Sequence, residues 1–234
     1  MKKRKIYGWM LPVYLFVLIG FFVGAHFFSS SVTTIAETTI TDGRTCVIID
    51  AGHGGVDGGA TSCTGVLESK LNLDVATRLN DLLHLLGIKT KMIRTDDISI
   101  FTKGSTIAAK KVSDLKERIR IVNTMNDSVL ISIHMNYFTD SRYYGPQVFY
   151  ASTQGSKDFA NCMQASLNHY TGTERQTKQA TGVYLMQNIQ RTGILVECGF
   201  ISNPVEEAKL CDSVYQKKLC CIMAANTAVF LANT

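Results

Sequence analysis

One segment near the start of the chain constrains the fold most, because an apolar strand leads directly into a glycine-rich loop. Residues 46–49 (CVII) form a mostly β-branched run, typical of a fully buried strand. The run ends at Asp50, and residues 52–59 (GHGGVDGG) follow, with His53 near the start of the loop. Ligands of open α/β sheets bind beyond the carboxyl ends of strands, and glycine permits close backbone approach. A ligand site at His53 and a tight turn with a surface histidine both fit; a P-loop is disfavoured, because no Gly-Lys-Ser/Thr follows.

Strand-like and helix-like segments alternate along the rest of the chain. We expect strands over 46–49, 89–93, 129–133, 147–150, 183–186 and 194–196, and helices over 64–86, 107–125, 159–167 and 214–231, with a short helix opened by Asn203-Pro204. In the helix over 107–125, Leu115, Ile119 and Val122 define the apolar face, and we place Arg118 among the charged residues around it. The alternation predicts an α/β fold: one domain with a mostly parallel mixed sheet flanked by helices on both faces.

The N-terminus carries the pattern of a membrane anchor. Four basic residues (2–5) precede an apolar run over 6–28, which is long enough to cross a bilayer. We expect 1–29 to be an uncleaved signal anchor, 30–44 a Ser/Thr-rich tether, and 45–234 the compact domain, exported to the outer face of the membrane. One alternative is a signal peptide cleaved near 29–31, which would release the domain. A buried core helix would leave the basic cluster unexplained.

The distribution of charge argues against a nucleic-acid partner. The formal net charge is +5, and residues 2–5 supply most of it, which leaves about +1 for the rest of the chain. A nucleic-acid-binding domain is expected to carry a basic patch or stripe. We therefore expect no nucleic acid among its partners.

The seven cysteines do not form a recognisable framework. They are Cys46, Cys63, Cys162, Cys198, Cys211, Cys220 and Cys221. Their number is odd and there is no Cys-x-x-Cys pair, which disfavours a structural zinc cluster or a disulfide scaffold. For an exported domain this leaves two interpretations: reducing surroundings, or one or two pairs that the sequence does not assign.

Chemically useful side chains follow three of the expected strands. These are His53, His134 and Glu197, and Glu68 lies at the start of the helix after the first loop. If the three strands are neighbours, the four side chains converge at one edge of the sheet. Two histidines and a carboxylate form a catalytic zinc set, and a second carboxylate acts as general base. Singly, each residue has a structural alternative: a hydrogen-bonded histidine, or a glutamate that favours the helix dipole. Of the remaining histidines, His26 lies in the expected anchor, and His84 and His169, on expected helices, are expected to be bystanders.

Several motifs together identify a family resemblance. They are DAGHGGVDGGA at 50–60, Glu68 with LNLDVATRL at 71–79, RTDD at 94–97, RIRIVN at 118–123, ISIHMN at 131–136 and ILVECGFISN at 194–203. In this order they resemble the zinc-dependent N-acetylmuramoyl-L-alanine amidases of the amidase-3 type, over about residues 45–232. The resemblance implies that His53, Glu68 and His134 bind Zn²⁺ and that Glu197 is the catalytic glutamate. Asn136 occupies the asparagine position of the SIHxN motif, where it would orient the ligands, contact substrate or stabilise the loop.

One departure from the family concerns the segment before Glu197. The family often has a proline there, whereas residues 190–193 read QRTG. The shape of that loop is therefore open. Asp50 and Asp57 also stay open, each either a partner of His53 or a turn-forming aspartate. The glycines of 52–59 are expected to give clearance for a bulky glycan.

The resemblance implies hydrolysis of the amide bond between N-acetylmuramic acid and L-alanine in peptidoglycan. The short chain, with one membrane segment and no wall-binding repeats, resembles the spore-cortex, germination-related amidases, which implies a role in muramic-δ-lactam formation, in the forespore or cortex space. An accessory or regulatory protein is a further partner to consider. Two alternatives remain: a zinc peptidase that cuts within the stem peptide, and a membrane-anchored, non-catalytic wall-binding protein.

Overall fold

A computed structural model describes residues 45–234 of the chain. The signal anchor expected over 1–29 and the tether expected over 30–44 lie outside the described residues. Within 45–234, no helix combines the length and the apolar character needed to cross a membrane.

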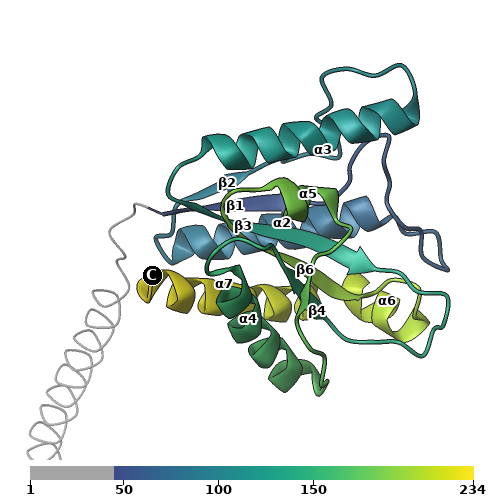
Figure 1. Cartoon of the computed structure of the whole chain (residues 1–234). Coiled ribbons are helices and arrows are strands. Elements are labelled where there is room, and N and C mark those ends of the chain that lie inside the picture. Colours follow the sequence, from purple (N-terminus) through teal and green to yellow (C-terminus); the bar gives the residue numbers. More distant parts are fainter. Residues whose placement is uncertain (1–44) are drawn as a thin grey trace, which may run out of the picture. The chain divides into compact units, whose positions relative to one another are not determined.

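The described residues form a six-stranded mixed sheet. Its strands are β1 (Cys46–Ala51), β2 (Thr90–Met92), β3 (Ser128–Asn136), β4 (Gln147–Tyr150), β5 (Lys178–Gln179) and β6 (Thr192–Phe200). The order across the sheet is β2-β1-β3-β6-β4-β5, and the first four run parallel while β4 is antiparallel to β6. The three strands that carry the candidate residues are therefore adjacent, and their carboxyl ends meet at one edge (Figure 1).

Helices cover both faces of the sheet. They are α2 (Glu68–Leu85), α3 (Ile107–Thr124), α4 (Ser156–Thr171), α5 (Tyr184–Asn188), α6 (Pro204–Cys211) and α7 (Ser213–Ala232). Val47 and Ile49 of β1 belong to the core shared with α2, α4 and α7, whereas Ile48 belongs to the core shared with α3 and α5. Figure 1 shows α3 on one side of the sheet and α2 with α7 on the other. The α/β class with a mixed, two-sided sheet is confirmed.

Side-chain caps mark the first turns of α3 and α6. The Thr106 hydroxyl accepts a hydrogen bond from the Ala109 N–H and caps α3. The Asn203 side chain accepts from the Val205 and Glu206 N–H groups, and Pro204 occupies the first turn of α6, where its missing N–H costs nothing. The start expected at Asn203-Pro204 is therefore correct.

The strand expected over 183–186 is wrong. Residues Tyr184–Asn188 form the short helix α5, and its buried Leu185 and Met186 pack into the core on the α3 side of the sheet. A four-residue apolar run fits a strand and a buried helical turn equally well, so periodicity alone does not separate them. The edge strand is instead β5, which pairs with β4 through two exposed polar residues and carries no apolar signal.

The position expected for Arg118 is also wrong. Its side chain is only 2% exposed and is among the largest fully buried side chains of the domain. Arg118 lies three residues after Leu115 and four before Val122, and this spacing puts it on the buried face of α3. The charge of the side chain predicts a solvent-facing position, and the burial of Arg118 contradicts that prediction.

All seven cysteines lie within the described residues, and all are free thiols. Cys46, Cys198 and Cys220 are buried, and the other four are exposed. The structure therefore pairs none of them.

Candidate metal centre

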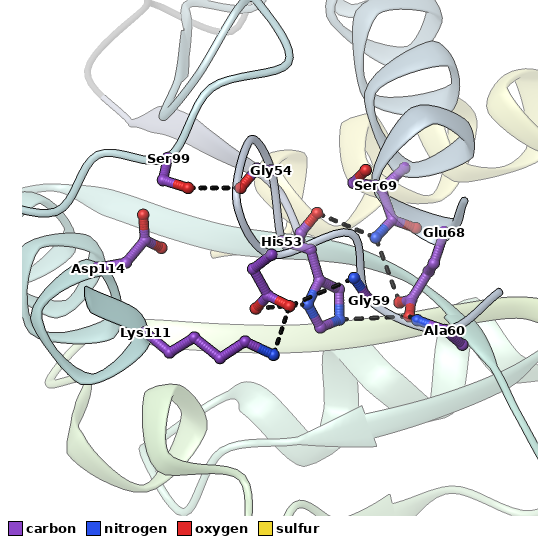
Figure 2. Close-up of polar contacts among 12 residues, drawn as sticks. His53, Gly54, Gly59, Ala60, Glu68, Ser69, Ser99, Lys111 and Asp114 are labelled. Atoms are coloured by element: carbon purple, nitrogen blue, oxygen red, sulfur yellow. Dashed lines mark hydrogen bonds and ion pairs between the residues drawn. The ribbon is translucent and has the colours of Figure 1, made fainter. Parts of the chain in front are cut away.

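Three side chains from separate elements converge at the carboxyl edge of the sheet. His53 lies in the loop after β1, Glu68 is the first residue of α2, and His134 lies near the end of β3. One ligand-type atom of each residue lies within 4.8 Å of the other two. The Glu68 carboxylate stands between the two rings, with Oε1 2.9 Å from His134 Nδ1 and Oε2 3.3 Å from His53 Nε2. Figure 2 shows His53 and Glu68 facing each other across this gap.

The protein holds the Glu68 carboxylate through further hydrogen bonds. The Ala60 N–H donates to Oε2 at 2.9 Å, the Met135 N–H donates to Oε1 at 3.2 Å, and the Asn72 amide donates to Oε1 at 3.3 Å. Burial by itself would raise the pKa of Glu68, but hydrogen bonds and charge from His134 and His53 outweigh it and hold that pKa well below its usual range. Glu68 is therefore ionised and oriented before any ligand binds.

His53 is fixed at both its backbone and its ring. Its φ angle is +60°, a left-handed conformation that costs a non-glycine residue about 1–3 kcal/mol. Ring Nδ1 donates a hydrogen bond to Asp57 Oδ2 at 3.0 Å. Burial of the ring lowers the pKa of His53, but Glu68 and then Asp57 outweigh burial and raise that pKa to about 9. The sequence left Asp57 as either a partner of His53 or a turn-forming aspartate. The hydrogen bond shows that Asp57 is the partner of the His53 ring.

Glu197 stands beside this cluster on the adjacent strand. In the parallel pairing of β3 and β6, Glu197 is the register partner of His134. Its Oε2 is buried and has no hydrogen-bond partner among the described residues. Burial raises the pKa of Glu197 to about 7; the neighbouring His134 and His53 act against this shift, and the charge of Glu68 adds to it. A buried carboxylate oxygen without a partner indicates an interaction that a ligand completes.

Two glycines make room for these side chains. A Cβ on Gly52 would lie 2.2 Å from ring atoms of His134. A Cβ on Gly59, whose φ is +68°, would lie 2.6 Å from Glu68 Oε2 and 2.8 Å from His53 Cδ2. At Gly52 and Gly59, the space expected to admit a glycan is therefore filled by side chains of the metal centre.

The replacement Gly52→Ala is expected to displace the His134 ring and weaken metal binding about 10- to 100-fold, as for a lost supporting contact. The reason is the overlap of the added methyl group with the ring. Metal affinity from competition with a chelator measures the effect. Gly58→Ala is the matched control, because its Cβ would approach only the end of the Leu67 side chain, at 3.2 Å. Equal affinities of the two variants would contradict the prediction.

Two buried arginines that the sequence reasoning missed support the loop backbone. Arg94 donates hydrogen bonds to the carbonyls of Ala51, Gly52 and Ser69, at 2.8–3.0 Å. Arg118 donates to the carbonyls of Ala51 and His53, the latter at 2.7 Å, and forms an ion pair with buried Asp50. The Ser132 hydroxyl donates to the other Asp50 oxygen. Asp50 thus anchors Arg118 and does not contact the His53 ring.

The other candidate residues lie outside the cluster. Asn136 is half-buried at the end of β3, and its carbonyl accepts from the Ile201 N–H at 2.8 Å. His84 lies on α2 with its ring against the Thr90 hydroxyl, and His169 lies on α4. Neither histidine joins the three-residue group.

The departure at 190–193 lies at the other end of β6. The Gln190 N–H donates to the Asn123 side chain, and the Arg191 guanidinium donates to the Met125 carbonyl beyond the end of α3. Strand β6 begins at Thr192, five residues before Glu197. The segment without the proline therefore lies at the opposite end of β6 from the metal centre.

The donor set fits a divalent transition metal. Two imidazoles and one carboxylate, with a carboxylate hydrogen-bonded to one imidazole, are typical of catalytic zinc sites with an open position. The three candidate ligands come from elements that the buried network already fixes, and the unpartnered Glu197 oxygen lies next to them. His53, Glu68 and His134 could therefore hold the ion, and Glu197 could act on what binds beside it.

Comparison with known proteins identifies the family. The family model described as N-acetylmuramoyl-L-alanine amidase matches residues 47–225, which include all four residues of the centre. The chain belongs to this amidase family. The amidase is 35% identical over 176 residues to the germination-specific N-acetylmuramoyl-L-alanine amidase of Bacillus subtilis, with 74% of each chain covered.

Solved structures agree with this assignment. The CwlD amidase from Clostridioides difficile, solved in complex with the GerS lipoprotein, has a TM-score of 0.77 and 32% identity, covering 81% of this chain and 99% of that one. An N-acetylmuramoyl-L-alanine amidase from Clostridium difficile 630 has a TM-score of 0.71 and 30% identity, with 82% and 98% covered. The chain is therefore an N-acetylmuramoyl-L-alanine amidase.

Proposed function

We propose that the amidase uses Zn²⁺ held by His53, Glu68 and His134 to cleave the bond between N-acetylmuramic acid and L-alanine, with Glu197 as general base. The observation that carries the proposal is the three-residue cluster next to a buried, unpartnered carboxylate oxygen. Zinc in such a site polarises the scissile carbonyl and lowers the pKa of its water. The zinc dependence of the family supports this choice of metal.

The chain's own residues handle the proton. Glu197 removes a proton from the water that attacks the carbonyl carbon, and it delivers that proton to the nitrogen of L-alanine as the carbon–nitrogen bond breaks. The products are a lactyl carboxyl group and a free L-alanine amine. The placement of Glu197 suits both steps, because its buried, unpartnered oxygen belongs to the strand next to His134. We assign Asn136, beside the centre, to contact with the substrate.

We further propose a role in spore-cortex maturation. Similarity to a germination-specific amidase supports it, and removal of the stem peptide would be the first step of muramic-δ-lactam formation. The domain would act on the cell-wall side of the membrane, anchored by residues 1–29 through the tether over 30–44. Because the CwlD structure contains the GerS lipoprotein, an accessory protein is proposed as a partner here too.

Digestion of purified peptidoglycan tests the proposed reaction. We expect the zinc-loaded protein to release peptides that begin with a free L-alanine amine, a chelator to abolish the release, and added zinc to restore it. Mass analysis of the muropeptides identifies the new amine. A new amine on an internal residue would instead indicate a stem-cutting peptidase. Peptidoglycan binding without bound zinc or product would indicate a wall-binding protein.

A further inference from the structure

The partner of the His53 ring is itself held by a residue of another element. Asp57 accepts the His53 hydrogen bond on Oδ2, and its second oxygen, Oδ1, lies 2.7 Å from Lys111 Nζ. Lys111 belongs to α3, more than fifty positions further along the chain. Figure 2 shows the Lys111 side chain extending to the carboxylate beside His53. A chain of contacts thus runs from α3 to the candidate ligand.

The same helix also contacts the backbone of the His53 loop and the segment that precedes α3. Asp114 accepts from the Ile100 N–H and from Arg118, and Arg118 donates to the His53 carbonyl. Lys111, Asp114 and Arg118 recur at a spacing of three and four, so they lie on one side of α3. Through Arg118, α3 contacts the backbone carbonyl of His53. Through Lys111, it contacts the Asp57 carboxylate that is hydrogen-bonded to the His53 ring.

We propose that Asp57 and Lys111 are a positioning pair, which orients the His53 ring for zinc and thereby makes zinc affinity depend on a residue outside the ligand set. The inference rests on the proposed zinc site, but not on the reaction that the site performs. Neither residue is a ligand or the proposed base.

The physical reason lies in the two nitrogens of the imidazole. Because Nδ1 donates to Asp57, the nitrogen left for a metal is Nε2, which faces Glu68 at 3.3 Å and would bind the ion in place of its proton. A carboxylate in this position fixes both tautomer and ring rotation. Asp57 is partly exposed and its carboxylate can rotate, so Lys111 and the Gly59 N–H, at 3.3 Å, hold its Oδ1 in place. Lys111 therefore acts through Asp57.

Zinc affinity of the full-length protein, measured by competition with a chromophoric chelator at constant ionic strength, tests the pair. We expect Asp57→Ala to weaken zinc binding about 10- to 100-fold. We expect Lys111→Met to weaken it about two- to fivefold, Lys111→Arg to restore it, and Lys116→Met to leave it unchanged. Lys116 is an exposed lysine on the same helix, so its replacement controls for the loss of charge.

A double-mutant cycle separates positioning from long-range charge. Removal of the Lys111 cation also lessens the electrostatic repulsion of Zn²⁺, and it does so by the same amount in the wild type and in Asp57→Ala. If Lys111 acts through Asp57, Lys111→Met weakens binding in the wild type but not in Asp57→Ala. In the Co²⁺-substituted protein, Asp57→Ala is expected to shift the visible absorption bands, because the ring turns. Asp57→Asn keeps one acceptor oxygen and serves if the alanine variant does not fold; we expect a smaller loss of affinity and the same shift.

Three results would overturn the inference: wild-type protein that binds no zinc, Asp57 variants that bind zinc as tightly as wild type, or an equal effect of Lys111→Met in both backgrounds. The amidase proposal fails separately. If zinc affinities follow the expected pattern but no stem peptide is released, the reaction is wrong and the positioning pair stands. If release is normal and the variants bind zinc like wild type, only the positioning pair is wrong.

Discussion

Replacement of Glu197 by glutamine is expected to slow the release of stem peptide by about 10²- to 10⁴-fold, the contribution typical of a positioned general base. Glutamine keeps the shape of the side chain but accepts no proton from the attacking water. The rate constant for appearance of the L-alanine amine, at saturating zinc and peptidoglycan, measures the effect. Zinc affinity should stay near the wild-type value, because Glu197 lies outside the proposed ligand set. Undiminished release would remove Glu197 from the mechanism.

The stability of the same variant provides the control against unfolding. In metal-free protein the pKa of Glu197 is about 7, against an ordinary value of 4.5. Between these pH values the folded state keeps a proton that the unfolded state has lost, so the free energy of unfolding falls as the pH rises. Glutamine has no such charge. Metal-free Glu197→Gln should therefore be more stable than wild type at about pH 8, and this difference should shrink at about pH 4. A variant less stable at both pH values would leave its low activity attributable to misfolding.

The sequence predicted the parts of the centre that periodicity and strand order control. Apolar runs located β1, β3 and β6, and the tendency of ligands to bind at the carboxyl ends of parallel strands placed His53, His134 and Glu197 at one edge. The structure agrees in placement, although β3 and β6 each extend past the residue expected to end them. Adjacency of the three strands was a condition that only the structure supplies.

The supporting contacts were not predictable in the same way. The contact between Asp57 and Lys111 joins a loop to a helix with no periodic signal to connect them. The sequence predicts that Gly52 gives clearance to a substrate, because nothing in it indicates that the His134 ring occupies the space beside this glycine. Arg118 is different: its spacing did place it on the buried face of α3, and a prior expectation about charge overrode that signal.

The replacement of this buried arginine, Arg118→Met, is expected to lower the free energy of unfolding by about 3–5 kcal/mol, the effect of removing one partner from a buried ion pair. Arg118 and Asp50 are 2% and 1% exposed, so the variant would leave a buried carboxylate without its cation. Chemical denaturation of the metal-free protein measures the loss. Arg120→Met is the matched control on the same helix: Arg120 is 60% exposed and pairs with Glu117, so its loss should cost less than about 1 kcal/mol.

The pH dependence of this loss identifies its cause. Burial of Asp50 favours the protonated acid, but the charge of Arg118 and the Ser132 hydroxyl outweigh it and hold the pKa of Asp50 below its ordinary value. In the wild type, the ionised carboxylate therefore adds stability above the ordinary pKa, and this stability is lost as the pH falls. Without Arg118, burial dominates and raises the pKa of Asp50 above its ordinary value. The difference in free energy of unfolding between wild type and Arg118→Met should therefore widen from acid to neutral pH. Asp50→Asn in the Arg118→Met background should recover part of the loss, because it removes the stranded charge. If the difference in free energy of unfolding does not change with pH, the loss of stability comes from lost packing and from the lost hydrogen bonds to the carbonyls of Ala51 and His53, and not from the ion pair.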